Sequence, residues 1–374
     1  MPVPDSVPPR GEPPHRLQSA TFAGAGRQLD VIVAALLLVV LVLLAWLLPV
    51  PFAQMRPGPA VDVLGSKAGT DFITVTGHQT YPTSGRLDLT TVSVTAPGER
   101  LPLLAMLAGW LSPRSAIVPV TYVYPRSLSV AQVQQQNAEE MDASQTTATA
   151  AGLRQAGIKV TGRVQILSIA EDAPAGGKLR AGDYVTSVDG TAISTPEELR
   201  ARIRAHKPGD KLRFDYVRGT TEGTVDIVAG PARDDAHVAA VGVTPGVGYL
   251  SDVVASVHLP EQIGGPSAGM MFALGLYDKL TPGSLTGGRT VAGTGTIDAN
   301  GKVGPIGGIQ QKVNGAREAG ATIFLAPASD CSSAGSAGVD GITVYRVGTL
   351  ADSVTVLTEL DANKPVTIPI CGRS

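Results

Sequence analysis

The sequence has few of the residues that hold metals or bind nucleic acids. Its 374 residues include two cysteines and five histidines, and neither Cys-x-x-Cys nor His-Glu-x-x-His occurs. A built-in zinc site is therefore not expected. The 30 Lys and Arg residues are balanced by 32 Asp and Glu, which gives a net charge of -2 and no basic excess for binding phosphates. We expect no cofactor, no metal and no nucleic-acid partner.

One long apolar run is present near the start of the chain. Residues 31–48 read VIVAALLLVVLVLLAWLL, without a charged side chain, and Pro49 and Pro51 follow. Eighteen helical residues span ~27 Å, close to a bilayer core of roughly 30 Å. We expect a transmembrane helix over residues 30–50. A cleaved signal peptide is the alternative, but the following PVPFAQM is a poor cleavage site, so an uncleaved anchor is favoured.

The orientation of this span is not decided by charge. Arg16 and Arg27 precede it and Arg56 and Lys67 follow it, which is a near tie under the positive-inside rule. The Pro-rich residues 1–29 are expected to be a disordered cytoplasmic tail. A single early span before a long folded region is typical of a signal anchor. We therefore expect a single-pass protein of the cell membrane with its bulk outside the cytoplasm, an orientation that rests partly on the family resemblance described below.

Residues 159–231 alternate short strand patterns with one well-capped helix. They contain Ala173-Pro-Ala, Leu179-Arg-Ala-Gly-Asp-Tyr-Val, Val188-Asp-Gly-Thr and Pro196-Glu-Glu-Leu. This block resembles a PDZ domain of the kind found in bacterial envelope proteases. The resemblance implies a small β-sandwich or barrel with helices, which binds extended peptide ends by adding a strand to a sheet edge.

The same resemblance implies where the peptide binds. The receiving loop is expected near Gly162, Arg163 and Val164, facing the helix at Leu199 and Ile203. A solvated charge at the end of a strand is the simpler interpretation of Arg163.

The C-terminal block carries the residues suited to catalysis. Gly264-Gly-Pro-Ser-Ala-Gly is a glycine-rich turn that opens into an apolar helix, which places Ser267 where free backbone N–H groups gather. We expect the N–H groups of Gly265 and Ser267 to stabilise an oxyanion. A serine nucleophile needs a base. His258 is interpreted as a packed or exposed strand residue. Lys312, after Pro-Ile-Gly-Gly, is the candidate.

These two motifs together resemble the proteolytic domain of the Lon family. They are GGPSAGMMFAL and VAGTGTIDANGKVGPIGGIQQK, in the same order and spacing. The resemblance implies that Ser267 is the nucleophile, Lys312 its base, and Thr294 a residue that orients the lysine. An acid that Lon proteins commonly carry three residues before the serine is replaced by Gly264. No Walker motif is present. The segment Asn300-Gly-Lys-Val resembles the end of one, but its spacing from Gly295 is wrong and Val303 stands where Ser or Thr is required.

The resemblance to Lon domains begins before the PDZ block. Gly85-Arg-Leu-Asp-Leu-Thr-Thr-Val is similar to the start of a Lon domain. The expected organisation, in chain order, is a linker at 51–70, the first part of a Lon-like domain at 71–158, an inserted PDZ domain at 159–231 and the Lon proteolytic domain at 238–369. The expected fold class is an α/β (α+β) Lon-type domain with an inserted PDZ domain and one transmembrane helix. This arrangement resembles the membrane-bound Lon-like PDZ proteases of Gram-positive bacteria.

The predicted function is that of a membrane-anchored serine endopeptidase that works without ATP. It would cleave unfolded or exposed segments of extracytoplasmic proteins or peptides, with the PDZ domain selecting substrate. A membrane-tethered PDZ adaptor with an inactive protease fold is the alternative, and Gly264 favours it. Lon domains often form hexameric rings, so a homo-oligomer is expected from the resemblance. Cys331 and Cys371 either form a disulfide or are two free thiols.

Overall fold

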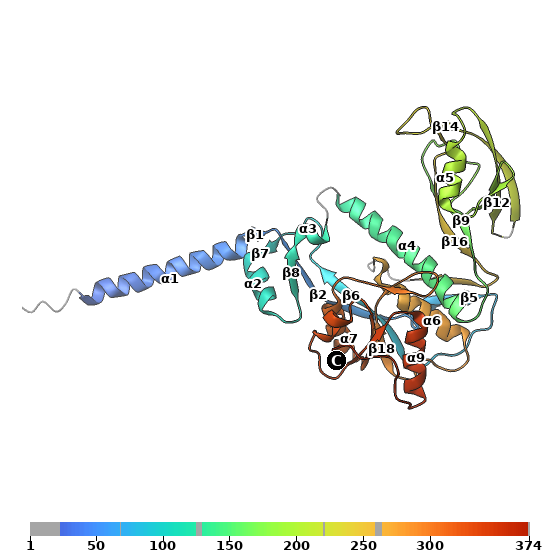
Figure 1. Cartoon of the computed structure of the whole chain (residues 1–374). Helices are drawn as coiled ribbons and strands as arrows, with labels where there is room; N and C mark the ends of the chain where they lie inside the picture. Colours follow the sequence, from blue (N-terminus) through green and yellow to red (C-terminus); the bar gives the residue numbers. More distant parts are fainter. Residues whose placement is uncertain (1–22, 68, 125–128, 220, 259–263, 373–374) are drawn as a thin grey trace, which may run out of the picture.

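The computed structural model describes residues 23–67, 69–124, 129–219, 221–258 and 264–372, with the side chains of 23–28 and Leu47 excepted. Most of the tail expected at residues 1–29 lies outside this range. A long helix, α1 (Ala23–Leu47), extends away from the rest of the protein (Figure 1). Its residues Leu29–Trp46 are apolar and unburied and are long enough to cross a membrane, a property that signal sequences share. The helix ends three residues before the expected boundary at 50, because Pro49 begins the short strand β1 (Pro49–Val50).

The segment expected to be a linker is instead a strand of the central sheet. β2 (Phe52–Asp62) pairs with β6 (Arg86–Val94) and β8 (Ala116–Pro119), antiparallel to both. Pro57 and Gly58 suggested a linker, but the register of β2 shifts between Pro57 and Ala60, which accommodates them. A Cβ on Gly58 would lie 2.3 Å from Thr91 Oγ1, so only glycine allows β6 this close.

The central sheet has the strand order β22-β21-β18-β6-β2-β8. β18 (Thr290–Gly293) pairs parallel with β6 and with β21 (Ile323–Pro327), which pairs parallel with β22 (Thr343–Val347). Alternate residues of these strands divide between two cores. One contains residues of the helices α4 (Val130–Gln155), α6 (Gly269–Leu280) and α9 (Leu350–Asp361). The other contains residues of α7 (Ile309–Glu318) and α8 (Cys331–Gly335).

The PDZ-like block has its own sheet and its own core. Its strand order is β13-β12-β10-β9-β16, and β11 pairs with β10. The elements are β9 (Thr161–Ile169), β10 (Tyr184–Val188), β11 (Thr191–Ala192), α5 (Pro196–Arg204), β12 (Lys211–Arg218), β13 (Thr221–Val228) and β16 (Val243–Leu250). In Figure 1 this unit lies beyond the end of α4, away from α1. Because the block lies between β6 and β18 in the sequence, it is an insertion in the fold built on the central sheet.

Short elements complete the described fold. They are β3 (Ser66–Lys67), β4 (Thr70–Asp71), β5 (Ile73–Thr76), β7 (Leu101–Pro102), α2 (Leu103–Leu111), α3 (Val120–Val123), β14 (Gly230–Pro231), β15 (Ala239–Ala240), β17 (Val254–Val257), the 3-10 turn η1 (Pro266–Ala268), β19 (Thr296–Ile297) and β20 (Val303–Gly304).

The C-terminal segment is tied down by a disulfide between Cys331 and Cys371, whose Cα atoms are 5.1 Å apart. The backbone N–H of Cys371 donates to Val344 O (2.8 Å), and that of Arg346 donates to Pro369 O (2.8 Å). The end of the described chain therefore lies along β22, to which the backbone bonds hold it, and the disulfide joins it to α8.

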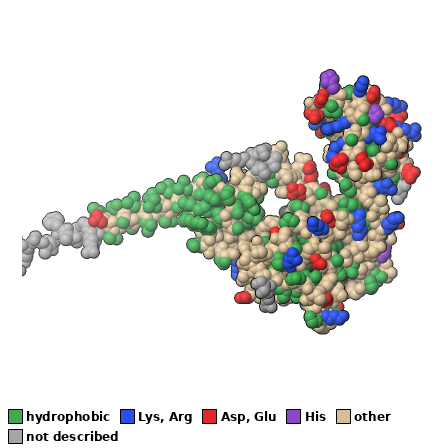
Figure 2. Space-filling view, in the orientation of Figure 1, with side chains coloured by type: hydrophobic (Ala, Val, Ile, Leu, Met, Phe, Trp, Pro, Cys, Tyr) green, Lys and Arg blue, Asp and Glu red, His purple; other side chains and the backbone are tan. Residues whose placement is uncertain are grey.

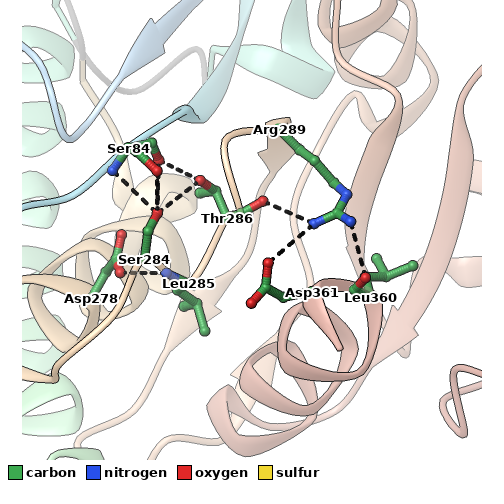
Figure 3. Close-up of polar contacts among 8 residues, drawn as sticks. All are labelled: Ser84, Asp278, Ser284, Leu285, Thr286, Arg289, Leu360 and Asp361. Carbon is green, nitrogen blue, oxygen red and sulfur yellow. Dashed lines mark hydrogen bonds and ion pairs between the residues drawn. The ribbon is translucent and has the colours of Figure 1, made fainter. Parts of the chain in front are cut away.

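A polar network holds the end of α6 that is remote from Ser267 (Figure 3). Asp278 is fully buried; its Oδ1 accepts from the N–H of Leu285 (2.7 Å), and its Oδ2 has no hydrogen-bond partner within the described residues. This burial raises the pKa of Asp278 to about 6. Nearby, Ser84 Oγ donates to Ser284 Oγ (2.8 Å), and Thr286 donates to the carbonyl of Ser84. The loop after α6 is thereby fixed to the segment that enters β6.

Candidate active site

Ser267 lies in η1, at the entrance of α6. Gly265 precedes this turn with φ 85°, a left-handed conformation that glycine adopts without strain, and Pro266 takes the first helical position. The carbonyl of Ser267 accepts from the N–H of Gly295 (2.8 Å) and from Thr294 Oγ1 (2.9 Å). The serine turn is thus bonded to the chain that leaves β18.

Lys312 lies on α7 and points into the same place. Its Nζ donates to Ser267 Oγ (2.7 Å) and to Thr294 Oγ1 (2.9 Å). α7 begins after Gly308, whose left-handed φ of 67° is a conformation that glycine adopts without strain. Three residues from separate parts of the fold therefore form one hydrogen-bonded cluster: Ser267 of η1, Thr294 directly after β18, and Lys312 of α7.

The environment of Lys312 favours its neutral form. The lysine is 3% exposed, and its burial lowers its pKa from 10.5 to about 7, against an opposing effect of the Asp330 carboxylate. Asp330 is itself held by the N–H of Ile306, which donates to its Oδ2 (3.0 Å). Near neutral pH a large fraction of the lysine is uncharged. In that form the contact can run from Ser267 Oγ–H to the Nζ lone pair, which is the arrangement that a general base needs.

Ser267 and Lys312 open onto a cavity of about 900 Å³. Its walls come from β2, β6, α4 and the serine turn, and its lining includes Val92, Tyr124 and Glu140. β18 ends opposite Leu89, so residues 90–94 of β6 pair with β2 on one side only. The cavity therefore has a partly unpaired strand along it.

Sequence reasoning missed the side chains that α4 contributes near the serine turn. Asn137 and Glu140 line the cavity, and Ser144 Oγ donates to Pro266 O (3.0 Å). Residues 137, 140 and 144 are three and four positions apart, so they share one face of a helix. That polar stripe is the signal which would have identified them.

The predicted oxyanion donor Gly265 is engaged elsewhere. Its N–H donates to Asn137 O of α4 (3.3 Å), so in this structure it does not point to substrate. Ser267 is the second residue of the 3-10 turn η1, where the first N–H groups have no partner within the turn. Gly264 is also explained by α4, because a Cβ there would lie 3.3 Å from the Cβ of Asn137. A larger acidic residue would press against this helix.

His258 is separate from this cluster. Its backbone N–H donates to Phe72 O (2.7 Å), its side chain is exposed, and it does not line the cavity. Within the described residues, no group of three or more His, Cys, Asp or Glu residues is arranged to hold a metal ion.

The predicted peptide-binding residues of the PDZ-like block do not lie at a free sheet edge. Gly162, Arg163 and Val164 of β9 pair with residues 247–249 of β16, and Val164 also pairs with β10. Leu199 and Ile203 are buried in the core of this block. The prediction of a groove at β9 was wrong because the strand that covers this edge comes about 80 residues later in the chain, beyond the reach of a local pattern.

The terminal strand on that side of the sheet is β16, which lies next to α5. The guanidinium of Arg200 on α5 donates to Pro245 O of β16 (3.2 Å). A cavity of about 270 Å³ lies beside α5, lined by Arg200, Ile203 and Arg204, by residues 232–234, which include Arg233 and Asp234, and by residues 239–243, of which only Val243 belongs to β16. The hollow beside α5 therefore lies at residues 239–243, at the start of β16, and not at β9.

Comparison with known families gives two matches along the chain. Residues 236–336 match the Lon protease (S16) C-terminal proteolytic domain, and residues 132–228 match the PDZ domain. The PDZ match begins inside α4 and ends with β13, whereas the block expected from the sequence is 159–231. The Lon match lies within the expected 238–369 except for its first two residues.

Individual relatives give the same picture. Lon protease 2 of Bacillus subtilis is 36% identical over 181 residues, which is 48% of this chain and 28% of the relative. Lon protease 1 of the same organism is 32% identical over 155 residues, 38% of this chain and 17% of the relative. The chain thus spans less than a third of the length of these relatives. Among solved structures, the PDZ domain of an SdrC-like protein from Listeria monocytogenes is 28% identical, covers 22% of this chain and 86% of that chain, and has a TM-score of 0.21.

Proposed function

Because the chain carries a Lon-type proteolytic domain and a PDZ domain, we propose that it is a membrane-anchored serine endopeptidase that works without ATP. The observation that carries the proposal is the 2.7 Å contact between Ser267 Oγ and the buried Nζ of Lys312. A lysine on a helix surface is charged and solvated, whereas this one has a pKa of about 7 and faces a hydroxyl. A lysine with a lowered pKa beside a hydroxyl group can act as a general base, whereas a lysine in a surface ion pair must stay charged.

The proposed reaction uses the three clustered residues in two steps. Lys312 takes the proton of Ser267 as Oγ bonds to the carbonyl carbon of the substrate, and then passes that proton to the amine as the C–N bond breaks. The resulting acyl-enzyme is attacked by water, whose proton Lys312 accepts and returns to Oγ. Thr294 keeps Nζ aligned by accepting its second hydrogen bond.

The cavity favours an extended substrate over a folded one. A peptide laid along residues 90–94 of β6 can pair with the edge that β18 leaves open. No nucleotide-binding motif for ATP-driven unfolding occurs in the sequence. The proposed substrates are therefore unfolded segments, exposed tails and small proteins.

The proposal places α1 in the cell membrane, and the protease and PDZ domains that follow it outside the cytoplasm. Its apolar stretch Leu29–Trp46 supports a span by length and composition. Assembly into a homo-oligomer, a hexamer by resemblance to Lon rings, is part of the same proposal.

Substrate selection is assigned to the hollow beside α5. We expect a peptide with a free C-terminal carboxylate to bind there, because the three arginines of the lining, Arg200, Arg204 and Arg233, outnumber its one carboxylate, that of Asp234. The double variant Arg204→Glu and Arg233→Glu should weaken binding of a fluorescent peptide by about tenfold or more at low salt. Arg202→Glu is the matched control, because Arg202 lies on the same helix outside the cavity lining. Equal loss in both variants, or equal binding of an amidated peptide, would contradict the assignment.

The test of the function is cleavage by the full chain in lipid vesicles without nucleotide. A labelled, permanently unfolded protein serves as substrate, and Ser267→Ala serves as the control. Cleavage by the wild type that is lost in the variant is the expected result. If neither cleaves while the hollow beside α5 still binds peptide, the adaptor alternative replaces the peptidase.

A further inference from the structure

The helix α2 (Leu103–Leu111) has a composition that does not suit a surface helix. Its sequence is LLAMLAGWL, with no charged residue on any face. Helices that are apolar all round are normally buried in a core or a membrane. In this structure, however, Leu107, Trp110 and Leu111 are 41%, 77% and 87% exposed.

The inner side of α2 is firmly held, so its outer side is fixed in place. Gly109 is buried against β2 and β8, where an added Cβ would lie 2.5 Å from the Gln54 side chain and 2.7 Å from that of Ile117. Ser115 Oγ also donates to Gly109 O (2.6 Å). The exposure of the outer residues is therefore a property of a well-packed helix.

α2 begins at the point where α1 ends. β1 pairs with β7, joining Pro49 to Pro102, and the N–H of Leu103 donates to Leu48 O (3.0 Å). Figure 1 shows α2 beside the end of α1, and in Figure 2 the hydrophobic surface of α1 continues onto this part of the protein. The apolar surface of α2 is thus continuous with the candidate membrane span.

The exposed residues are of the kind that lie at the boundary between lipid and water. Trp110 of α2 and Tyr122 of α3, which is 79% exposed, have rings that are apolar with one polar group. The nine residues of α2 extend about 14 Å, too short for a bilayer core of roughly 30 Å. A helix of this length and composition can lie along the interface and cannot span it.

We propose that α2 is a second membrane contact, which lies in the lipid–water interface and holds the protease domain against the bilayer surface. The inference rests on the proposed function in one respect, that α1 is in the membrane. The occupant of the apolar face is lipid, because that face adjoins the span and carries no charge to pair with a protein.

The two tryptophans of the chain, Trp46 in α1 and Trp110 in α2, report on the two contacts separately. The full chain is reconstituted in phosphatidylcholine–phosphatidylglycerol vesicles as the single-tryptophan variants Trp46→Phe and Trp110→Phe. Quenching by lipids brominated on the acyl chain is compared with quenching by iodide in the water. Trp110 is expected to be quenched by brominated lipid and shielded from iodide.

A further pair of variants, made in the Trp46→Phe background, checks that the face itself makes the contact. Leu111→Glu should reduce the lipid quenching of Trp110 several-fold. Val228→Glu, at an exposed valine of the PDZ block, should leave it unchanged. Circular dichroism confirms that both variants are folded.

The remaining outcomes separate this inference from the anchor. Quenching of Trp110 by iodide alone, with Trp46 still quenched by lipid, overturns the inference and leaves the anchor standing. Shielding of Trp110 from both quenchers overturns it in favour of a second copy or another protein on α2. If brominated lipid quenches neither tryptophan, the anchor fails and the inference fails with it.

Discussion

Replacing Lys312 by methionine should abolish cleavage and, at the same time, stabilise the protein at neutral pH. The loss of the base is expected to reduce kcat/KM by about 10³-fold or more. The free energy of unfolding should rise because burying the charged lysine destabilises the folded state: the pKa of Lys312 is about 7 in the folded protein, whereas its ordinary value is 10.5. The folded state therefore binds this proton more weakly than the unfolded state, and the penalty is largest below pH 7. It shrinks as the pH rises towards 10.5.

The size and the sign of this effect make the prediction easy to check. The lowering of the lysine pKa from 10.5 to about 7 corresponds to roughly 3–5 kcal/mol of lost folding free energy at pH 6. Denaturant unfolding of both proteins at pH 6, 8 and 10 should show a difference that decreases with pH. Lys302→Met is the matched control, because Lys302 is an exposed lysine of the same domain and should change neither activity nor the pH trend. A Lys312→Met protein that is less stable than the wild type at every pH would show that the lysine is charged and paired.

The rate of cleavage should depend on pH through the same group. Only the neutral lysine can accept the proton of Ser267, so kcat/KM is expected to rise about tenfold per pH unit below 7 and to level off above it. The measurement is an initial-rate profile from pH 5 to 9 with a short fluorogenic peptide, whose own charge does not change in this range.

Asp330 provides a variant that moves the profile without touching the reacting atoms. Its carboxylate raises the pKa of Lys312, so Asp330→Asn should shift the inflection to lower pH. The asparagine retains an oxygen that can accept from the N–H of Ile306. An inflection that stays in place in this variant, or a flat profile in the wild type, would contradict the assignment of Lys312 as the base.

The fold class was predictable because both domains carry strong local signals. Turns such as Gly182-Asp183 and Asp189-Gly190 fix the PDZ pattern, and the glycine and proline motifs around Ser267 and Lys312 fix the Lon pattern. The family match and the mixed α/β structure confirm that class. The structure brings Ser267, Thr294 and Lys312 into hydrogen-bond contact, and their catalytic roles stay a prediction.

The predictions that the structure contradicts concern residues whose contacts come from segments far away in the sequence. Pro57 and Gly58 are typical of a linker, and only the pairing with β6 shows that they form an irregularity in a strand. β9 was expected to have an open edge, which β16 covers. Gly265 was expected to donate to an oxyanion, but a carbonyl of α4 takes its N–H. In each case the partner is far away in sequence, and its choice depends on tertiary packing that a local pattern does not contain.

The insertion of the PDZ block also sets the order in which the protein can be completed during synthesis. β2 and β6 are made before the inserted block, but the parallel partner of β6, the strand β18, follows the entire block. Pairing across so long a separation is slow and depends on a nearly complete chain. Ser267, Thr294 and Lys312 all belong to the part that is made last. A chain released after β16 and before Ser267 therefore holds the PDZ core and lacks all three residues of the hydrogen-bonded cluster. If the proposed function holds, such an incomplete product cannot cleave its neighbours.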